Sequence, residues 1–178
     1  AVFPHSEGLS DLMMENIARE FNFSETVFIF PPSNQSADFQ VRIFTPGGEI
    51  PFAGHPTIGA GFLLAYLAMI PLNSPQTSVI LEEKVGNIPV TIYSENGIPH
   101  SAELKSTNTP EFFDDIPTSE TLAEVLSLSM EDLHPSFAPK AVSCGLPFLI
   151  IPVNRLSALQ RAKINLSIWR ETLKDSVA

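Results

Sequence analysis

Residues 44–59 read FTPGGEIPFAGHPTIG, and this stretch decides how the first half of the 178-residue chain is interpreted. Prolines, glycines, a carboxylate and a histidine gather here, directly before an apolar helical pattern over residues 57–70. Proline is favoured in the first turn of a helix, so Gly54, His55 and Pro56 are predicted to lie at a helix start. The first amides of a helix have no partner inside it and carry the positive end of its dipole. Such a place suits a bound carboxylate or phosphate, which makes His55 a candidate site residue.

The helix predicted over residues 57–70 is apolar nearly all round, so it should be covered on most sides. Gly59 and Gly61 weaken it, and close approach of neighbouring backbone is the expected reason for their presence. Residues of strand-like composition or alternation flank it at 26–30, 39–43, 78–82, 88–93 and 101–104. Several strands around one buried helix predict a sheet rolled around that helix.

Two further patterns precede this helix. Ser10 is a plausible cap of a first helix. The buried stripe of that helix is predicted from apolar residues that recur every fourth position, namely Leu9, Met13, Ile17 and Phe21. In the strand over residues 39–43, Gln40 and Arg42 alternate with apolar residues, which predicts one solvated face. Residues 1–4 resemble the tail of a strand.

The second part of the chain begins after a loop-like stretch over residues 107–117, which is interpreted as a linker. Beyond it, the predicted elements are a helix at 119–128, strands at 141–142 and 148–153, and short helices at 154–163 and 166–174. The order helix, strand, strand, helix thus begins again, which indicates a second, similar unit.

Composition excludes several classes of partner. The hydrophobic fraction of 44% and the charged fraction of 17% indicate a globular protein with a core. A net charge of −10 disfavours binding to nucleic acid or to anionic membranes. The longest apolar run, residues 62–72, is too short to span a bilayer. With Cys144 as its one cysteine the chain cannot form an internal disulfide, which suits a reducing, cytoplasmic location.

Glu25 lies between the first helix and the first long strand, in the sequence NFSETVF (residues 22–28). One interpretation is a solvated turn residue. The other is a proton shuttle, which requires dry surroundings that Phe21, Phe23 and Phe28 could provide. Both interpretations stay open from the residues alone.

His55 likewise has two interpretations: its ring hydrogen-bonds the turn, or it donates to an anionic substrate at the helix start. Glu49 is interpreted as a structural carboxylate and Arg42 as a surface or ion-pairing residue. No metal site is predicted, because the four histidines have no short ligand spacing and one cysteine cannot build a thiolate site. Cys144 is interpreted as a small buried residue rather than a nucleophile.

These residues resemble the PhzF-like family, the phenazine-biosynthesis isomerase and its relatives. The resemblance covers nearly the whole chain and is strongest at three stretches: NFSETVF (22–28), RIFTPGGEIPFAGHPTIGA (42–60) and GLPFLIIPV (145–153). It implies the diaminopimelate-epimerase-like α/β fold, in which each of two similar domains is a mixed sheet rolled around a central helix. The active site of that fold lies in the cleft between the domains.

The resemblance also implies residue roles. Glu25 corresponds to the family's proton-transferring acid/base, and His55 to its substrate-contacting histidine. Ser24, Gly54, Pro56 and Thr57 belong to the same two motifs and are expected to bind substrate. No metal and no cofactor are implied. Related racemases use two cysteines, whereas the loop at residues 53–55 has no thiol, so a two-thiol mechanism is not supported.

Family members continue beyond the last residue here, so the chain is expected to hold residues 1–110 as one domain lacking its first strand, and residues 118–178 as the beginning of a second. The stretch alone is expected to be inactive and to expose apolar surface around residues 148–153. The implied function is a proton-shift isomerase acting on a small anionic unsaturated metabolite, with a homodimer as the expected assembly. Two alternatives remain: a relative that binds a metabolite without turnover, and a structural or partner-binding protein.

Overall fold

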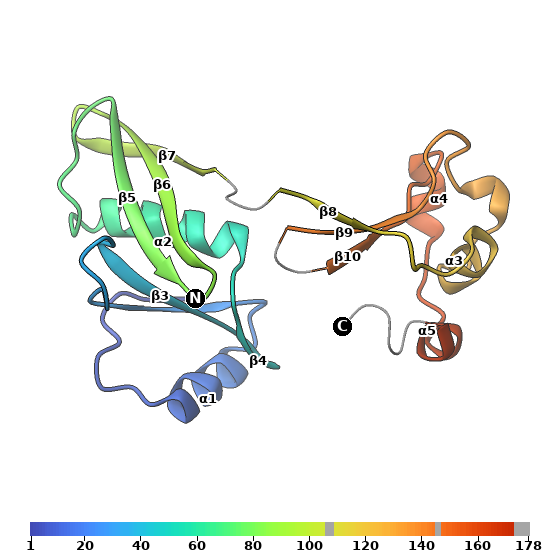
Figure 1. Ribbon diagram of the computed structural model, residues 1–178, viewed down its shortest axis with the longest axis horizontal. Coiled ribbons are helices and arrows are strands. Elements are labelled where there is room, and N and C mark those ends of the chain that lie inside the picture. The colour runs from blue at the N-terminus through green and yellow to red at the C-terminus, as the bar shows by residue number, and fades with distance from the viewer. Residues whose placement is uncertain (106–108, 145–146, 173–178) are drawn as a thin grey trace. The chain divides into compact units, whose positions relative to one another are not determined.

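A computed structural model describes residues 1–105, 109–144 and 147–172 of the chain (Figure 1). The chain divides into two compact units, Ala1–Thr107 and Asn108–Ala178. Parts of three sequence interpretations lie outside the described residues: Thr107 and Asn108 of the expected linker, Gly145 and Leu146 of the GLPFLIIPV stretch, and Leu173 and Lys174 of the expected last helix. Among the described residues, no helix has the length and hydropathy needed to cross a bilayer.

The described part of the first unit forms a seven-stranded mixed sheet in the order β1-β2-β3-β5-β6-β7, with β4 paired to β3. The β1/β2 and β3/β5 pairs are parallel, and the other pairs are antiparallel. The strands are β1 (Val2–Phe3), β2 (Thr26–Phe30), β3 (Phe39–Thr45), β4 (Gly48–Ile50), β5 (Gln76–Glu83), β6 (Gly86–Glu95) and β7 (Ile98–Leu104). Every strand predicted in this region is confirmed, and β1 contains the strand tail expected at residues 1–4.

Helix α2 (Gly54–Tyr66) lies against the inner side of this sheet (Figure 1). Ala60, Leu64 and Ala65 pack with the apolar side chains of β2, β3, β5 and β6 in the larger core. The central helix is therefore confirmed, but it begins three residues before the predicted start and ends four residues before the predicted end. Pro56 fits inside its first turn because the amide that proline lacks would have no partner there.

Helix α1 (Asp11–Phe21) covers the opposite face of β2 and β3 (Figure 1). Ser10 caps it as predicted, by accepting a hydrogen bond from the Met13 amide. The predicted stripe is wrong in part: Met14 and Ala18 are fully buried, whereas Met13 and Phe21 are about half exposed.

The prediction of a solvated face on β3 is also wrong. Phe44 shares the face of Arg42 and is buried, since it packs edge-on against Phe28 of β2 beneath α1. Strand β2 is thus covered on both sides: Val27 and Ile29 face the core around α2, while Phe28 faces α1.

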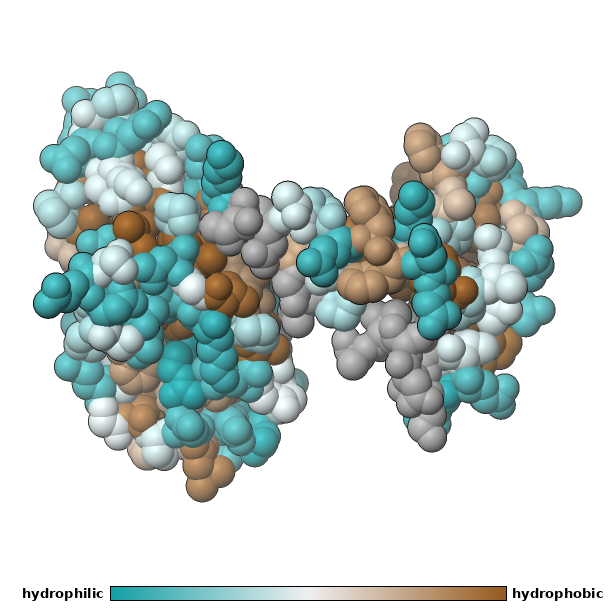
Figure 2. All heavy atoms as spheres, in the orientation of Figure 1, coloured by the Kyte–Doolittle hydropathy of each residue, from teal (hydrophilic) through white to brown (hydrophobic). Residues whose placement is uncertain are grey.

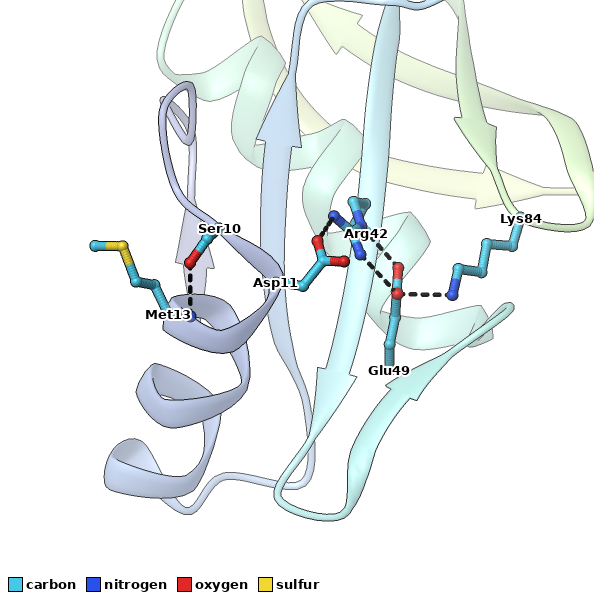
Figure 3. A network of polar contacts seen from close by, with 6 residues as sticks. All are labelled: Ser10, Asp11, Met13, Arg42, Glu49 and Lys84. Atoms are coloured by element: carbon cyan, nitrogen blue, oxygen red, sulfur yellow. Dashed lines mark hydrogen bonds and ion pairs between the residues drawn. The ribbon is translucent and has the colours of Figure 1, made fainter.

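Arg42 organises a polar network above Phe44 (Figure 3). Its Nε and Nη2 donate to the two Glu49 carboxylate oxygens at 2.8 and 2.7 Å, and its Nη1 donates to Asp11 Oδ1 at 2.7 Å. Lys84 Nζ also contacts Glu49 Oε2, at 2.6 Å. Burial acts to raise the pKa of Glu49, but the bonds from Arg42 and Lys84 outweigh it, so the pKa is lowered. Glu49 is thus a structural carboxylate and Arg42 an ion-pairing residue, as the sequence interpretation of each holds.

We predict that Glu49→Gln lowers the free energy of unfolding by about 1–3 kcal/mol at pH 7, because Arg42 loses a charged, two-point acceptor. Since the folded pKa is depressed, the contribution of Glu49 is present above its unfolded pKa and is lost as the pH falls. Urea denaturation at pH 7 and pH 3.5 measures both effects. Glu15→Gln removes only an exposed helical pair with Arg19 and serves as the control, with an expected cost below about 0.5 kcal/mol.

The described part of the second unit has a three-stranded antiparallel sheet in the order β10-β9-β8, with helical segments beside it (Figure 1). Its elements are β8 (Glu111–Phe113), α3 (Ser119–Val125), the 3-10 turn Met130–Asp132, β9 (Lys140–Ser143), β10 (Pro147–Ile150), α4 (Leu156–Arg161) and α5 (Leu166–Thr172). The predicted helices and strands are confirmed with shifted ends. The linker interpretation is wrong at residues 111–113, which form β8 and pair with β9.

The direction of strand pairing around a helix differs between the two units. In the first unit, β1 precedes α1, β2 follows it, and these two strands pair in parallel. In the second unit, β8 and β9 flank α3 in the same way but pair antiparallel. The repeated element order therefore does not produce the same strand pairing.

One face of the three-stranded sheet carries exposed apolar side chains. In Figure 2, brown spheres lie among teal ones on the second unit. Phe112 and Phe148 lie on this face because both pair with Val142, and Ile150 follows two residues along β10. All three side chains are exposed, which confirms the apolar surface expected around residues 148–153.

Candidate active site

Glu25 is held at the point where the chain passes from α1 to β2. Helix α1 ends at Asn22, which adopts a left-handed conformation (φ 50°) and whose amide donates to the Ala18 carbonyl. Three residues later, Glu25 directly precedes β2, so its position is fixed by the strand that crosses the core.

His55 is the second residue of α2, and β2 and α2 pack together in the larger core. The start of the strand and the start of the helix thereby meet. His55 Nε2 lies 3.0 Å from Glu25 Oε2, which confirms their predicted proximity. The Glu25 side chain is 18% exposed and the His55 side chain 76% exposed, so the carboxylate lies inward and the imidazole at the rim. Oε2 is buried and accepts no hydrogen bond from the described residues, and the imidazole is the polar group that lies beside it.

A pocket of about 450 Å³ opens at this point of the first unit. Most of its wall is apolar, and its ionisable side chains are Glu25 and His55. It is lined by Ala1, Val2, Phe23, Ser24, Glu25, Val27, His55, Pro56 and Gly59. Such a volume and lining suit a small metabolite with one charged group.

Four of the six predicted site residues line this pocket, namely Ser24, Glu25, His55 and Pro56. Gly54 begins α2 without lining it, so its contact with substrate stays a prediction. Thr57 needs a correction, because its side chain is fully buried and its hydroxyl contacts Ala53 and Glu83. Its amide donates to the Ala53 carbonyl, so neither polar group of Thr57 is free for a ligand.

The dry surroundings expected for Glu25 are confirmed for one of the three predicted phenylalanines. Phe23 lines the pocket, whereas Phe28 lies in the core beneath α1 and Phe21 packs against Phe3. Cys144 is exposed and not buried. Among the described residues, no three histidine, cysteine, aspartate or glutamate side chains are placed to hold a metal ion together.

Sequence reasoning missed Gly59 as a pocket residue. A Cβ at Gly61 would meet Val90 Cγ1 at 3.0 Å, so close approach is confirmed there. A Cβ at Gly59 would meet nothing within 4 Å, so the prediction that neighbouring backbone closely approaches this residue is wrong. One helical turn after His55, Gly59 instead leaves space in the pocket. Two glycines that lie two residues apart in one helix carry no sequence signal that separates these two reasons.

We predict opposite effects for two alanine substitutions in α2. Gly61→Ala should destabilise the fold by about 1–3 kcal/mol through overpacking against Val90. Gly59→Ala should leave stability unchanged or raise it by up to about 1 kcal/mol, since alanine favours helix. Its methyl group should narrow the pocket and weaken binding of a small acid. Denaturation curves and ligand-induced thermal shifts test the pair; equal destabilisation by both would contradict this assignment.

A protein-family model described as "Phenazine biosynthesis-like protein" (PhzC-PhzF) matches residues 1–178. The chain belongs to the PhzC-PhzF family. An uncharacterised isomerase of Mesorhizobium japonicum is 36% identical over 174 residues, which are 96% of this chain and 56% of that protein. The trans-2,3-dihydro-3-hydroxyanthranilate isomerase of Pseudomonas aeruginosa is 36% identical over 97 residues, 54% of this chain and 32% of that enzyme. Relatives of the PhzC-PhzF family thus include named isomerases, and the chain spans 56% of the first relative's length.

Solved structures support the same conclusion. The Bacillus anthracis phenazine biosynthesis protein of the PhzF family has a TM-score of 0.81 and 30% identity, over 98% of this chain and 56% of that one. A hydroxyproline epimerase of Agrobacterium vitis, with a TM-score of 0.57 and 16% identity over 88% of this chain and 44% of that one, shares the fold alone. The mixed α/β, diaminopimelate-epimerase-like fold implied by the resemblance is therefore confirmed.

Proposed function

We propose that the whole protein is a cofactor-independent isomerase that moves a proton on a small, anionic, unsaturated metabolite. The observation that carries this proposal is the contact of Glu25 with His55 inside a largely apolar pocket. A carboxylate in such a place can accept a proton from carbon, and an imidazole beside it can hold an acidic group of the ligand.

In the proposed reaction, Glu25 removes a proton from one carbon, and the electrons of that C–H bond shift into the conjugated system. Glu25 then returns the proton to another carbon on the same face, so the double bond moves and no group leaves. The His55 side chain and the amides of Gly54 and His55 stabilise the substrate carboxylate, because the helix dipole favours an anion there. The reaction needs water to be kept from Glu25 while the proton is in transit.

The relatives support this choice of substrate class. The named substrate of the Pseudomonas aeruginosa relative, trans-2,3-dihydro-3-hydroxyanthranilate, is an unsaturated ring carboxylate. A ligand of that class combines a carboxylate for His55 with an allylic C–H bond for Glu25. We propose the class only, because the pocket lining does not distinguish its members.

The test is a panel of unsaturated carboxylates, including trans-2,3-dihydro-3-hydroxyanthranilate, offered to the complete protein. Proton NMR of each mixture detects a shifted double bond, and thermal unfolding detects binding. Turnover of at least one acid supports the isomerase. A thermal shift without turnover supports the alternative of a relative that only binds a metabolite. If no acid is turned over and none shifts the thermal unfolding, a structural or partner-binding role is the remaining alternative.

A further inference from the structure

A second buried carboxyl group lies behind the first turn of α2, outside the pocket. Glu83, the last residue of β5, is 6% exposed and is not a lining residue. Its Oε1 lies 2.6 Å from Thr57 Oγ1. Its Oε2 is also buried and has no hydrogen-bond partner among the described residues. The proposed proton shift has no use for this side chain.

The protons around Thr57 can be counted from the distances. Thr57 Oγ1 lies 2.7 Å from the Ala53 carbonyl oxygen, which can only accept. The single hydroxyl proton of Thr57 therefore serves the carbonyl, and the 2.6 Å contact with Glu83 needs a proton of its own. A protonated Glu83 supplies it and completes a chain from Glu83 through Thr57 to Ala53. An ionised Glu83 would compete with Ala53 for one proton and leave two oxygens in contact without any.

The surroundings of Glu83 favour the same protonation state. Burial raises its pKa to about 7. Charged neighbours are engaged elsewhere: Glu82 accepts from Ser33, Lys84 pairs with Glu49, and His55 on α2 faces Glu25. None of them compensates a charge on Glu83.

We propose that Glu83 is a positioning residue that, as a neutral carboxylic acid, holds the first turn of α2 through Thr57 and so sets the place of His55 in the pocket. Ala53 precedes α2, and Thr57 lies two residues after His55. The chain of hydrogen bonds thus spans the turn that carries the imidazole. Ionisation of Glu83 breaks this chain and leaves a buried charge with an unpaired oxygen, which the fold relieves by loosening that turn.

Hydrogen exchange of the Thr57 amide, which donates to the Ala53 carbonyl at 3.2 Å, reports on this turn without requiring turnover. Protection factors are measured by NMR on the complete protein at pH 5.5 and pH 8.5, with the Val90 amide in β6 as internal reference. In the wild-type chain we expect the Thr57 protection to fall by about tenfold or more at the higher pH, relative to Val90.

Three variants separate the positioning role from general destabilisation. Glu83→Gln stays neutral and can still donate to Thr57, so it should keep high protection at both pH values. Glu83→Leu cannot donate and should show low protection at both. Glu82→Gln changes the neighbouring glutamate, which bonds Ser33, and should behave as the wild type.

A pH-independent Thr57 amide in the wild-type chain, or the wild-type fall retained in Glu83→Gln, would overturn the proposal. If a variant does not fold, a titration of the wild-type protein still tests the proposal. The carboxyl carbon of Glu83 should then titrate by NMR with a midpoint near 7. A midpoint at the ordinary value for glutamate would also overturn the proposal.

Discussion

Glu25→Gln in the complete protein should abolish proton transfer while leaving ligand affinity nearly unchanged. The amide has the shape of the carboxylate and can still face His55, but it cannot accept a proton from carbon. A general acid/base contributes roughly 10²–10⁴-fold to rate. As the single proposed proton carrier, Glu25 should lie at or above the upper end of that range.

The measurement is the turnover rate at saturating substrate, together with the thermal shift that the same substrate induces. His55→Gln is the matched control in the same pocket. It should weaken binding and raise KM, because the ligand loses its imidazole partner while the proton carrier is kept. Glu25→Gln turning over at the wild-type rate would remove this carboxylate from the mechanism.

Leu64→Asp should unfold the first unit or destabilise it by about 4–5 kcal/mol or more. Leu64 lies in the last turn of α2 and is fully buried in the larger core, where a carboxylate would have no partner and no water. Since small domains are stable by about 5–15 kcal/mol, such a loss removes most of the margin.

Circular dichroism and urea denaturation of the variant test this expectation. Leu67→Asp places the same charge directly after α2, where the side chain is about half exposed, and should cost about 1 kcal/mol or less. Similar stabilities of the two variants would contradict the assignment of α2 as the central buried helix.

Much of the first unit could be predicted because its patterns are long. The strand patterns of β3 and β6 and the continuous apolar composition of α2 each extend over several residues, and the structure confirms these three elements. Strands β4 and β8 have three residues each, too few for any periodicity. Such short strands form because a neighbouring strand offers hydrogen bonds, and which strand is the neighbour depends on the tertiary structure.

The faces of β3 and α1 were predicted wrongly for the same reason, because which face is covered depends on the tertiary structure. Alternation in β3 predicts two different faces, but it does not reveal that α1 covers the face that carries Arg42. Arg42 stays partly solvated because its charge is paired with Glu49 and Asp11, while Phe44 on the same face is buried. Apolar residues in α1 recur every fourth position along more than one line of the helix surface. The line that is buried against β2 and β3 is the one through Met14 and Ala18.

The candidate site was found through its motifs. The proline-containing helix start placed His55, whereas the choice of Glu25 as its partner came from the family resemblance. Thr57 was misassigned because a hydroxyl at a helix start suits a ligand or an internal acceptor equally well. The internal partner, Glu83, lies 26 residues further on and carries no local signal of its burial.

The most direct test of the central claim follows one proton. An active substrate carrying deuterium at the carbon that loses hydrogen is converted by the complete protein in ordinary water, and the product is analysed by NMR at low conversion. If Glu25 both removes and returns the proton in a pocket closed to water, part of the deuterium must appear at the receiving carbon. Product with no deuterium at that carbon would contradict transfer by a single, water-shielded carboxylate.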